Sequence, residues 1–259
     1  MLESIHPIPA FTDNYIWTLT DASSRKAAVV DPGDATPVLD FLAANDLQLS
    51  AVLITHHHPD HTGGLDTLIR EFAPVVYGPN NPAIEGINRP LAEGDTLQLF
   101  GADYSILEVP GHTLDHIAYY TESEEPPVLF CGDTLFAAGC GRLFEGTPAM
   151  MLESLGKLAA LPPDTRVYCT HEYTLANLRF AHAVEPDNPE LATRLGQEQA
   201  KRANDTPTLP STLALELQTN PFLRCRHAQL KAAAESHTGA GLRSEVDVFA
   251  AIRQWKDSF

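Results

Sequence analysis

Histidine and aspartate side chains gather in one short segment, THHHPDHTGG, which contains His56, His58, Asp60 and His61. The segment follows the apolar run SAVLI, which is typical of a buried strand. Residues two apart along an extended segment point to one side, so His56 and His58 are placed to bind one ion together. Pro59 turns the chain, and we expect Asp60 and His61 to face a second ion.

Three further histidine or aspartate residues stand in the same local setting, each just after an apolar run. His112 follows YSILEVPG, Asp133 follows PPVLFCG and His171 follows RVYCT. Side chains at the carboxyl ends of strands are held by a rigid scaffold and face the crevice in which α/β proteins usually place their sites. The pattern therefore predicts that these three residues join the first cluster.

The seven side chains are expected to hold two divalent metal ions per chain. Imidazole combined with carboxylate suits zinc, iron or manganese, and Zn²⁺ is our first expectation, with Fe or Mn as alternatives. The predicted ligands are His56, His58 and His112 for one ion, Asp60, His61 and His171 for the other, and Asp133 as the bridge. An isolated histidine is more often structural, but the HxHxDH cluster disfavours that interpretation.

Neighbouring residues have weaker claims to a role at the metals. His57 is expected to point to the opposite face of its strand and not to bind an ion. Asp115 and His116 lie close to His112 in the sequence. They either orient its imidazole or have plain structural roles, and both interpretations stay open.

Proline and glycine divide the first two thirds of the chain into short β-type runs, among them KAAVV, SAVLI, HIAYY and RVYCT. Helical patterns such as ATPVLDFLAANDL and GGLDTLIREFA alternate with these runs, which indicates layered α/β architecture with two sheets and outer helices. After His171 the segments become helix-like, from TLANLRFAHAVE to SEVDVFAAIRQWK. We therefore expect a catalytic, metal-binding domain over residues 1–172 and a helical domain over residues 173–259.

Composition excludes several function classes. The formal net charge is −17, with no run of lysine or arginine, so no nucleic-acid partner is expected. No apolar stretch approaches the run of about 20 residues that a membrane span needs, and the N-terminal segment lacks an export signal. Four dispersed cysteines, of which Cys131 and Cys140 flank Asp133, are interpreted as reduced packing residues. We expect a cytoplasmic monomer that acts on a small molecule.

Motifs spread along the whole chain resemble those of one enzyme family. THHHPDH, PGHTLDH, FCGDTLF, GCGRLFEGT, THEYT, NPFLR and IRQWKDSF together resemble glyoxalase II, the hydroxyacylglutathione hydrolases of the metallo-β-lactamase superfamily. HxHxDH alone indicates only the superfamily, and the later motifs narrow the resemblance. It implies an α/β fold, a metallo-β-lactamase-type αββα sandwich followed by a C-terminal helical domain, with the same seven metal ligands.

The resemblance also implies a glutathione site in the second half of the chain. The implied contacts are Arg142, Phe144, Tyr173, Arg253 and Lys256, with Asn177 as a weaker candidate. Arg253 and Lys256 are three apart in a helical pattern and share a face that suits a carboxylate, although a solvated basic face is the alternative. Phe144 lacks the hydroxyl of the tyrosine that some relatives carry there. Arg142 stands where others have lysine, and its planar fork can form bidentate bonds.

The implied reaction is the hydrolysis of S-(2-hydroxyacyl)glutathione thioesters, with S-D-lactoylglutathione giving D-lactate and glutathione in methylglyoxal detoxification. A water shared by two cations has its pKa lowered towards about 7 and becomes the attacking hydroxide. Asp60 and Asp133 are the predicted catalytic residues, Asp60 by orienting that hydroxide and Asp133 by bridging the ions. The leaving thiolate, whose conjugate acid has a pKa of about 8.5, needs no dedicated acid.

Two alternatives keep much of the ligand set and change the activity. A sulfur (persulfide) dioxygenase of the same superfamily uses one iron and lacks the helical extension with its paired basic residues. A non-catalytic metal-binding module is the second alternative, although structural zinc sites favour four tight ligands and a binuclear site leaves room for water. Metal stoichiometry, oxygen uptake and thioester turnover separate the three.

Overall fold

The computed structural model of the chain describes residues 2, 4–21 and 23–259. The chain forms two compact units. The first unit comprises Met1–Glu108 and Asp115–Gly132, and the second comprises Val109–Leu114 and Asp133–Phe259. The chain therefore passes between the units more than once, and both contain residues that the sequence predicts as metal ligands.

The first sheet of the first unit is mixed. Its strands, in spatial order, are β1 (Ser4–Ala10), β2 (Asn14–Asp21), β3 (Lys26–Val30), β4 (Gln48–Leu53), β5 (Val75–Pro79) and β6 (Arg89–Leu91). β1, β2 and β3 pair in antiparallel fashion, whereas β3, β4, β5 and β6 run parallel. Four of the five β3 residues are buried, as expected of a parallel strand that is covered on both faces.

Helices cover one face of this sheet. The helices of the first unit are α1 (Ala35–Asn45), α2 (Pro59–Thr62) and α3 (Leu65–Phe72). Asp34 caps α1 by accepting the Thr36 N–H at 2.8 Å, which satisfies one of the free donors at the helix start. Val38 of α1 and Leu68 of α3 belong to one buried cluster with Val52 of β4. The parallel strands and these helices thus form the scaffold from which the loop after β4 emerges.

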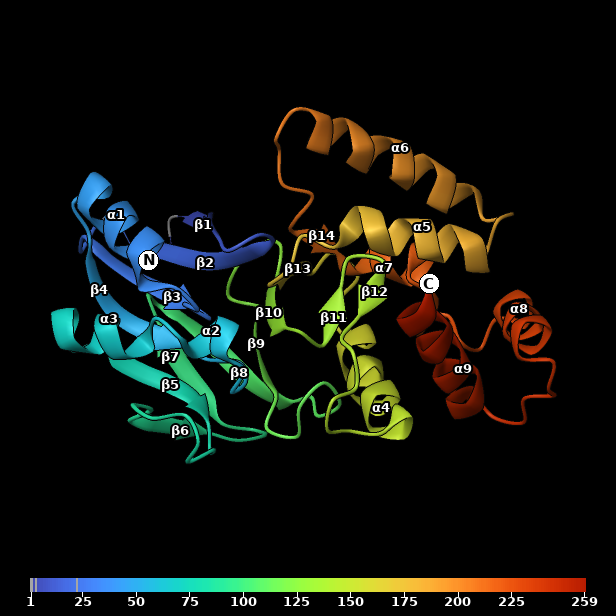
Figure 1. The fold of residues 1–259 in the computed structure, drawn as a ribbon. Coiled ribbons are helices and arrows are strands. Elements are labelled where there is room, and N and C mark those ends of the chain that lie inside the picture. The colour runs from blue at the N-terminus through green and yellow to red at the C-terminus, as the bar shows by residue number, and fades with distance from the viewer. Residues whose placement is uncertain (1, 3, 22) are drawn as a thin grey trace. The chain divides into compact units, whose positions relative to one another are not determined.

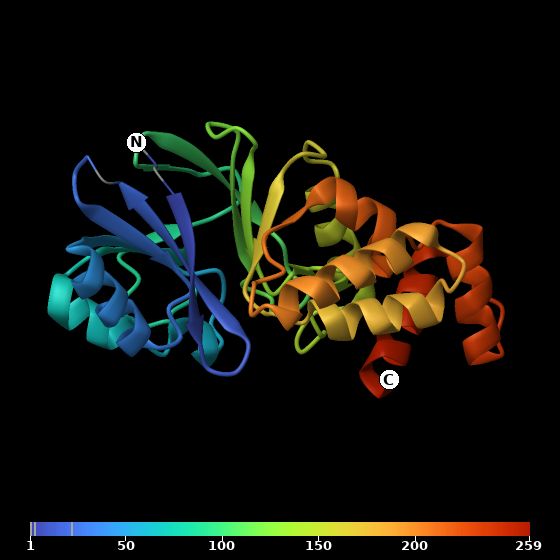
Figure 2. The ribbon, with the colours of Figure 1, turned by 90° about the horizontal axis from the view of Figure 1, so that it is seen from above.

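The second sheet contributes four neighbouring antiparallel strands to the first unit. They are β7 (Thr96–Leu99), β8 (Ala102–Glu108), β9 (Ile117–Thr121) and β10 (Val128–Gly132). Tyr119 donates its hydroxyl to Ile54 O at 2.7 Å, and the Ile117 N–H donates to Thr55 O at 2.9 Å. These bonds fasten β9 to the loop after β4. In Figure 2 the blue helices lie on one side of the blue strands and the green strands lie on the other.

The second unit is mainly helical. Its elements are β11 (Leu135–Phe136), β12 (Gly139–Cys140), α4 (Pro148–Ala159), β13 (Arg166–Cys169), α5 (Thr174–Val184), α6 (Pro189–Ala203), β14 (Ser211–Thr212), α7 (Leu213–Thr219), the 3₁₀ helix η1 (Pro221–Leu223), α8 (Ala228–Thr238) and α9 (Glu245–Ser258). The local sequence explains where two of these helices begin. Thr147 caps α4 and Asn188 caps α6, each followed by proline at the first helical position.

Apolar side chains hold the helices of the second unit together. α5 and α6 lie side by side (Figure 1), with Leu178 and Leu191 in a common buried cluster. Phe180 of α5 packs against Phe222 of η1, with ring centroids 6.2 Å apart, and edge-on against Trp255 of α9 at 5.7 Å. This aromatic packing anchors α9, the helix that carries the basic residues predicted for glutathione.

The helix-like segments TLANLRFAHAVE and SEVDVFAAIRQWK contain α5 and α9, and α6, α7 and α8 lie between them, so the helical character predicted after His171 is confirmed. The boundary between residues 172 and 173 stays a prediction. Among the described residues, no helix is long and apolar enough to cross a membrane.

Candidate metal centre

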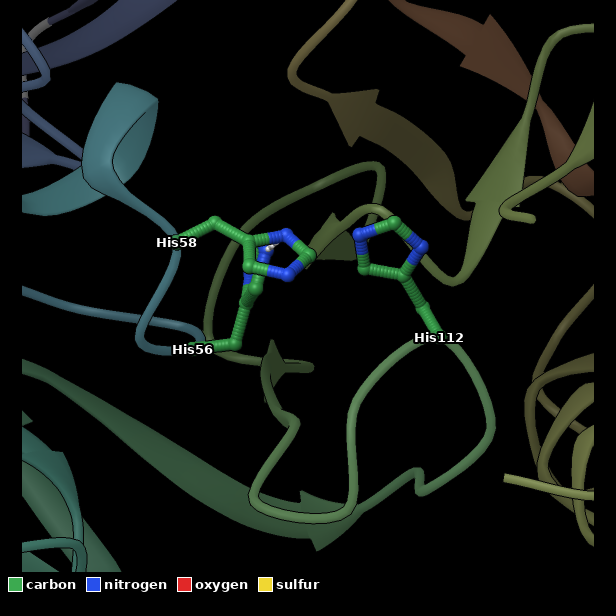
Figure 3. A group of neighbouring side chains, drawn as sticks. All are labelled: His56, His58 and His112. Atoms are coloured by element: carbon green, nitrogen blue, oxygen red, sulfur yellow. Dashed lines mark hydrogen bonds between the residues drawn. The ribbon is translucent and has the colours of Figure 1, made fainter. Parts of the chain in front are cut away.

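His56 and His58 form a pair in the loop after β4. The sequence predicts them on the end of a strand, but β4 ends at Leu53 and the histidines lie beyond it. His56 Nε2 lies 3.1 Å from His58 Nδ1 (Figure 3). Two nitrogen ligands of a tetrahedral zinc, each at about 2.0–2.1 Å, lie about 3.3 Å apart, so the spacing suits joint binding of one ion. Figure 3 also draws His112, which belongs to the second unit.

Asp60 and His61 form a second pair, on the short helix α2. Pro59 is the first residue of this helix, so the predicted turn is a helix start. His61 Nε2 lies 3.5 Å from Asp60 Oδ2, a spacing suited to two ligands of one ion. Asn14 of β2 donates its Nδ2–H to the same Asp60 oxygen at 3.2 Å. The carboxylate therefore has a partner that fixes its orientation.

Asp31, directly after β3, orients this part of the site and was not predicted from the sequence. His61 Nδ1 donates to Asp31 Oδ2 at 2.9 Å, and both side chains are buried. The carboxylate also accepts the Thr55 N–H at 2.8 Å and the Thr55 hydroxyl at 2.7 Å. A carboxylate behind an imidazole leaves the other ring nitrogen free of its proton and turned to a metal. The available signal was the aspartate after the apolar run KAAVV, the same pattern that marks the predicted ligands.

His57, Asp115 and His116 lie close to the histidine pair. His57 Nδ1 lies 2.9 Å from Asp115 Oδ1, and Asn81 donates to Asp115 Oδ2 at 2.7 Å. The His116 ring stacks on His56, with centroids 4.6 Å apart and planes 16° apart. Asp115 thus orients His57, and His116 buttresses a predicted ligand through its ring face.

Three predicted ligands meet in the second unit. Asp133 directly follows Gly132, the last residue of β10, and His171 lies two residues beyond β13. Asp133 Oδ2 lies 3.5 Å from His112 Nε2 and 3.2 Å from His171 Nε2, with all three residues buried. One carboxylate oxygen therefore stands between two imidazole nitrogens, which is the arrangement expected of a bridging ligand.

The backbone around Arg142 orients His112. His112 Nδ1 donates to Arg142 O at 2.7 Å, which leaves Nε2 as the nitrogen that faces Asp133. Gly141 permits this approach, because a Cβ at that position would lie 2.0 Å from Asp133 O and 3.1 Å from His112 Nδ1. Only glycine fits between the carboxylate residue and the histidine.

Aromatic rings lie beside the predicted ligands of the second unit. Tyr173 stacks on His171, with centroids 4.7 Å apart and planes within 1° of parallel. Phe136 meets both rings edge-on, at 5.8 Å from His171 and 5.6 Å from Tyr173. Phe144 stands edge-on to His112 at 5.2 Å and is 62% exposed. Phe144 and Tyr173 therefore offer accessible apolar surface beside the ligand residues.

Two of the three predicted cationic residues of the second unit share one carboxylate. Asp257 Oδ1 accepts Arg142 Nε–H at 3.2 Å and Arg253 Nη2–H at 3.1 Å. Arg253 is buried and lies over the Phe222 ring, whereas Arg142 is largely exposed. Lys256 Nζ lies over the Phe180 ring at 5.3 Å, and burial, with Arg253 and Arg179 nearby, lowers the pKa of this lysine.

Asn177 and the cysteines have structural contacts. Asn177 Nδ2 donates to the backbone carbonyl of Ala137 at 3.1 Å, a bond that fixes the backbone at that residue. The cysteines are buried thiols outside any disulfide, as the sequence indicates: Cys131, Cys140, Cys169 and Cys225. Burial raises the pKa of the Cys140 thiol to about 11, an effect partly offset by Arg253.

Comparisons with known proteins bear on this donor set. The family model described as metallo-beta-lactamase superfamily matches residues 15–171, and the model described as hydroxyacylglutathione hydrolase C-terminus matches residues 172–259. A hydroxyacylglutathione hydrolase of Pseudomonas aeruginosa (strain LESB58) is 56% identical over 98% of this chain and 99% of its own length. One of Nitrosomonas eutropha is 52% identical over 98% of both chains.

This chain belongs to the hydroxyacylglutathione hydrolase family. The match confirms the predicted family, the metallo-β-lactamase type of α/β fold and the helical region that follows it. The crystal structure of ETHE1 from Myxococcus xanthus has a TM-score of 0.66 with 22% sequence identity, and covers 99% of both chains. That likeness supports the fold alone. As a member of the hydroxyacylglutathione hydrolase family with these His and Asp groups, the chain binds divalent metal.

Proposed function

We propose that this chain is a thioester hydrolase that converts S-(2-hydroxyacyl)glutathione to a 2-hydroxy acid and glutathione. S-D-lactoylglutathione, which gives D-lactate, is the proposed substrate, in methylglyoxal detoxification. The observation that carries the proposal is the 56% identity to a hydroxyacylglutathione hydrolase over 98% of this chain. The glutathione-site residues predicted from the motifs all lie in the second unit, where aromatic and cationic side chains accompany three predicted metal ligands.

The proposed cofactor is a pair of divalent ions, most simply Zn²⁺, with Fe or Mn as alternatives. The proposed ligands are His56, His58 and His112 for one ion, Asp60, His61 and His171 for the other, and Asp133 as the bridge. Support comes from distances inside each unit. His56 and His58 are spaced as two ligands of one ion, as are Asp60 and His61, and Asp133 Oδ2 stands between two imidazoles.

The roles of the chain's own residues follow from this arrangement. Bound divalent ions would supply Lewis acidity and lower the pKa of a water towards about 7. Asp60, held by Asn14, is proposed to accept a hydrogen bond from the attacking water and direct it to the thioester carbonyl. Asp31 and the Arg142 carbonyl keep His61 and His112 in the tautomers that ligation needs. The departing thiolate, with a conjugate-acid pKa of about 8.5, leaves without a dedicated acid.

The glutathione site is proposed to use residues of two kinds. Arg142 and Lys256 offer cationic groups to the carboxylates of the tripeptide, and Phe144 and Tyr173 offer ring surface. Asn177 and Arg253 are proposed to complete the site. Both also donate to backbone carbonyls, Asn177 to Ala137 O and Arg253 to Cys140 O. Phe144 contributes no hydroxyl, so its contact with substrate is apolar.

The remaining proposals concern organisation. We propose a catalytic domain over residues 1–172 and a substrate-binding helical domain over residues 173–259. We also propose that the chain acts in the cytoplasm as a monomer, without a nucleic-acid or membrane partner. The formal net charge of −17 supports the absence of a nucleic-acid partner.

Thioester absorbance with S-D-lactoylglutathione tests the proposed function. We expect turnover by the metal-replete protein, loss of turnover with a chelator, and recovery when Zn²⁺ is restored. Metal analysis of the same sample should give two ions per chain. A metal-replete protein that leaves several acyl-glutathiones intact would support a non-catalytic module. One iron per chain with oxygen uptake would support a dioxygenase.

A further inference from the structure

The hairpin of β11 and β12 is too short to be stable by itself. Each strand has two residues, with Leu135 paired to Cys140 and Phe136 paired to Gly139. Ala138 at the turn has φ of 55°, a left-handed conformation that is uncommon for residues other than glycine. Isolated two-stranded hairpins are at best marginally stable in water, so contacts from elsewhere must hold this one.

Four buried side chains bind the hairpin backbone, and we call them the hairpin clamp. Its bonds are Asn177 Nδ2 to Ala137 O at 3.1 Å, Ala138 N–H to Glu216 Oε2 at 2.7 Å, Asn220 Nδ2 to Phe136 O at 3.1 Å and to Gly139 O at 2.9 Å, and Arg253 Nη1 to Cys140 O at 2.9 Å. These side chains come from α5, from α7 and the residue that follows it, and from α9. Figure 1 shows the hairpin beside α5 and α7.

Glu216 and Asn220 are themselves fixed by a buried polar network. Arg194 of α6 donates Nη2–H to Glu216 Oε1 at 2.6 Å, and Asn220 Nδ2 lies 3.1 Å from Glu216 Oε2. Arg194 Nη1 also donates to the Thr219 hydroxyl at 2.6 Å. Burying an ion pair is costly and often adds little net stability. Its value here is geometric, because it aims the clamp at particular backbone atoms.

The hairpin in turn positions three predicted metal ligands. Asp133 lies two residues before β11. Phe136, inside the hairpin, packs edge-on against the ring of His171 at 5.8 Å. Arg142, two residues after β12, supplies the carbonyl that orients His112. A small shift of the hairpin would therefore displace the carboxylate and both imidazoles around it.

We propose that Glu216 and Asn220 are positioning residues for Asp133, His112 and His171. The inference rests on the metal-binding role proposed for these three residues. Glu216 and Asn220 bond to the hairpin backbone at residues 136, 138 and 139, and we propose that they act on the predicted ligands through it. Removing their bonds weakens metal binding more than it weakens the fold.

The test compares Asn220→Asp with a matched Asn188→Asp variant. Asn220→Asp keeps the oxygen that accepts the Phe222 N–H at 3.0 Å but replaces the amide that donates to Phe136 O and Gly139 O. Asn188→Asp likewise keeps its capping oxygen and loses a donor bond to Gln218 O, which lies outside the hairpin. Both variants are measured for Zn²⁺ affinity by competition with a chromophoric chelator, for thermal midpoint, and for kcat.

We expect Asn220→Asp to lose about 10- to 100-fold in affinity for at least one ion, the range typical of groups that orient metal ligands. Asn188→Asp should stay within about twofold of the parent. Glu216→Gln, which keeps the shape and removes the charge, provides a second variant if Asn220→Asp does not fold. Parental metal affinity in the folded variants would overturn the proposal, as would failure of both variants to fold, since the clamp would then serve folding alone.

The metal readout separates this proposal from the proposed function. If the parent protein binds Zn²⁺ but does not hydrolyse glutathione thioesters, the proposed function fails and the affinity comparison still decides the role of the clamp. If the parent hydrolyses the thioester and Asn220→Asp retains full metal affinity, the proposed function stands and the clamp proposal fails.

Discussion

His61 donates its Nδ1–H to the carboxylate of Asp31 over 2.9 Å, with both side chains buried. Replacing Asp31 by asparagine removes the charge behind the imidazole while keeping one oxygen, which can still accept the Thr55 N–H. We expect metal affinity to fall about 10- to 100-fold in Asp31→Asn, as for other groups behind ligand imidazoles. Chelator competition and metal analysis of the dialysed protein measure this loss.

Asp34→Asn is the control for that variant. It lies in the same DPGD segment, and asparagine caps a helix about as well as aspartate. Both its metal content and its thermal midpoint should match those of the parent. Equal metal affinity in Asp31→Asn and Asp34→Asn would show that Asp31 does not support the metal ligand.

Asp257 joins Arg142 to Arg253, and its loss should weaken substrate binding. In Asp257→Asn the two guanidinium groups lose a charged acceptor that orients them. Partly exposed ion pairs contribute up to about 1 kcal/mol, so we expect KM for S-D-lactoylglutathione to rise about three- to fivefold with kcat little changed. Steady-state kinetics measure the change. Asp66→Asn, which breaks an exposed pair with Arg70, is the control, and an equal KM in both variants would refute the role.

The start of α9 depends on a capping box. Ser244 accepts the Asp247 N–H at 3.1 Å, and Asp247 accepts the Ser244 N–H at 2.9 Å. Ser244→Ala should lower the free energy of unfolding by about 1 kcal/mol, measured by urea denaturation. Ser258→Ala, at the other end of the helix, should leave the free energy of unfolding unchanged. An unchanged urea midpoint in Ser244→Ala would mean that the cap does not stabilise the fold.

The same cap gives a pH dependence with a defined sign. The backbone N–H of Arg243, followed by the bonds from Ser244, lowers the pKa of Asp247. Its contribution to stability is therefore present above the unfolded pKa of about 3.9 and is lost as the pH falls through the lower folded value. Asp247→Asn should lose less stability than the parent as the pH falls from about 4 to the acid limit of folding. Urea denaturation of both proteins at each pH measures the difference. A parallel pH profile would contradict the prediction.

The buried thiol of Cys140 should make the fold less stable at alkaline pH. Burial raises the pKa of Cys140 to about 11, while an unfolded thiol ionises near about 8.5. The folded pKa is the higher one, so stability is complete below about 8.5 and falls as the pH rises towards the folded value. The thermal midpoint should fall between about pH 8 and about pH 10.5, and this fall should be smaller in Cys140→Ala than in the parent. Equal differences would exclude a contribution from this thiol.

Sequence periodicity predicts the elements whose structure is set locally. KAAVV is β3, and ATPVLDFLAANDL contains α1 because Asp34 caps it and its apolar residues recur on one face. The hairpin of β11 and β12 is different. Each of its strands has only two residues, too few to show a periodic pattern, and its backbone is held by Glu216 and Asn220, about 80 residues further along the chain.

The sequence indicates which histidines and aspartates lie close together within each unit, but it predicts less of their local geometry. His56 and His58 pair as expected, but in a loop beyond β4 and not by strand alternation. Asp31 carries the same signal as Asp133, an acidic residue at a strand end, but a single carboxylate gives no indication of which histidine it serves. That choice depends on tertiary packing of β3 against the loop after β4.

The burial of all four cysteines has a consequence for the chemistry proposed for this chain. A hydrolase of glutathione thioesters releases one glutathione thiol in every turnover. Mixed disulfides form only when a thiolate is accessible to attack. Because all four sulfur atoms are buried, the folded protein presents no accessible thiolate, and we expect it to resist mixed-disulfide formation with glutathione.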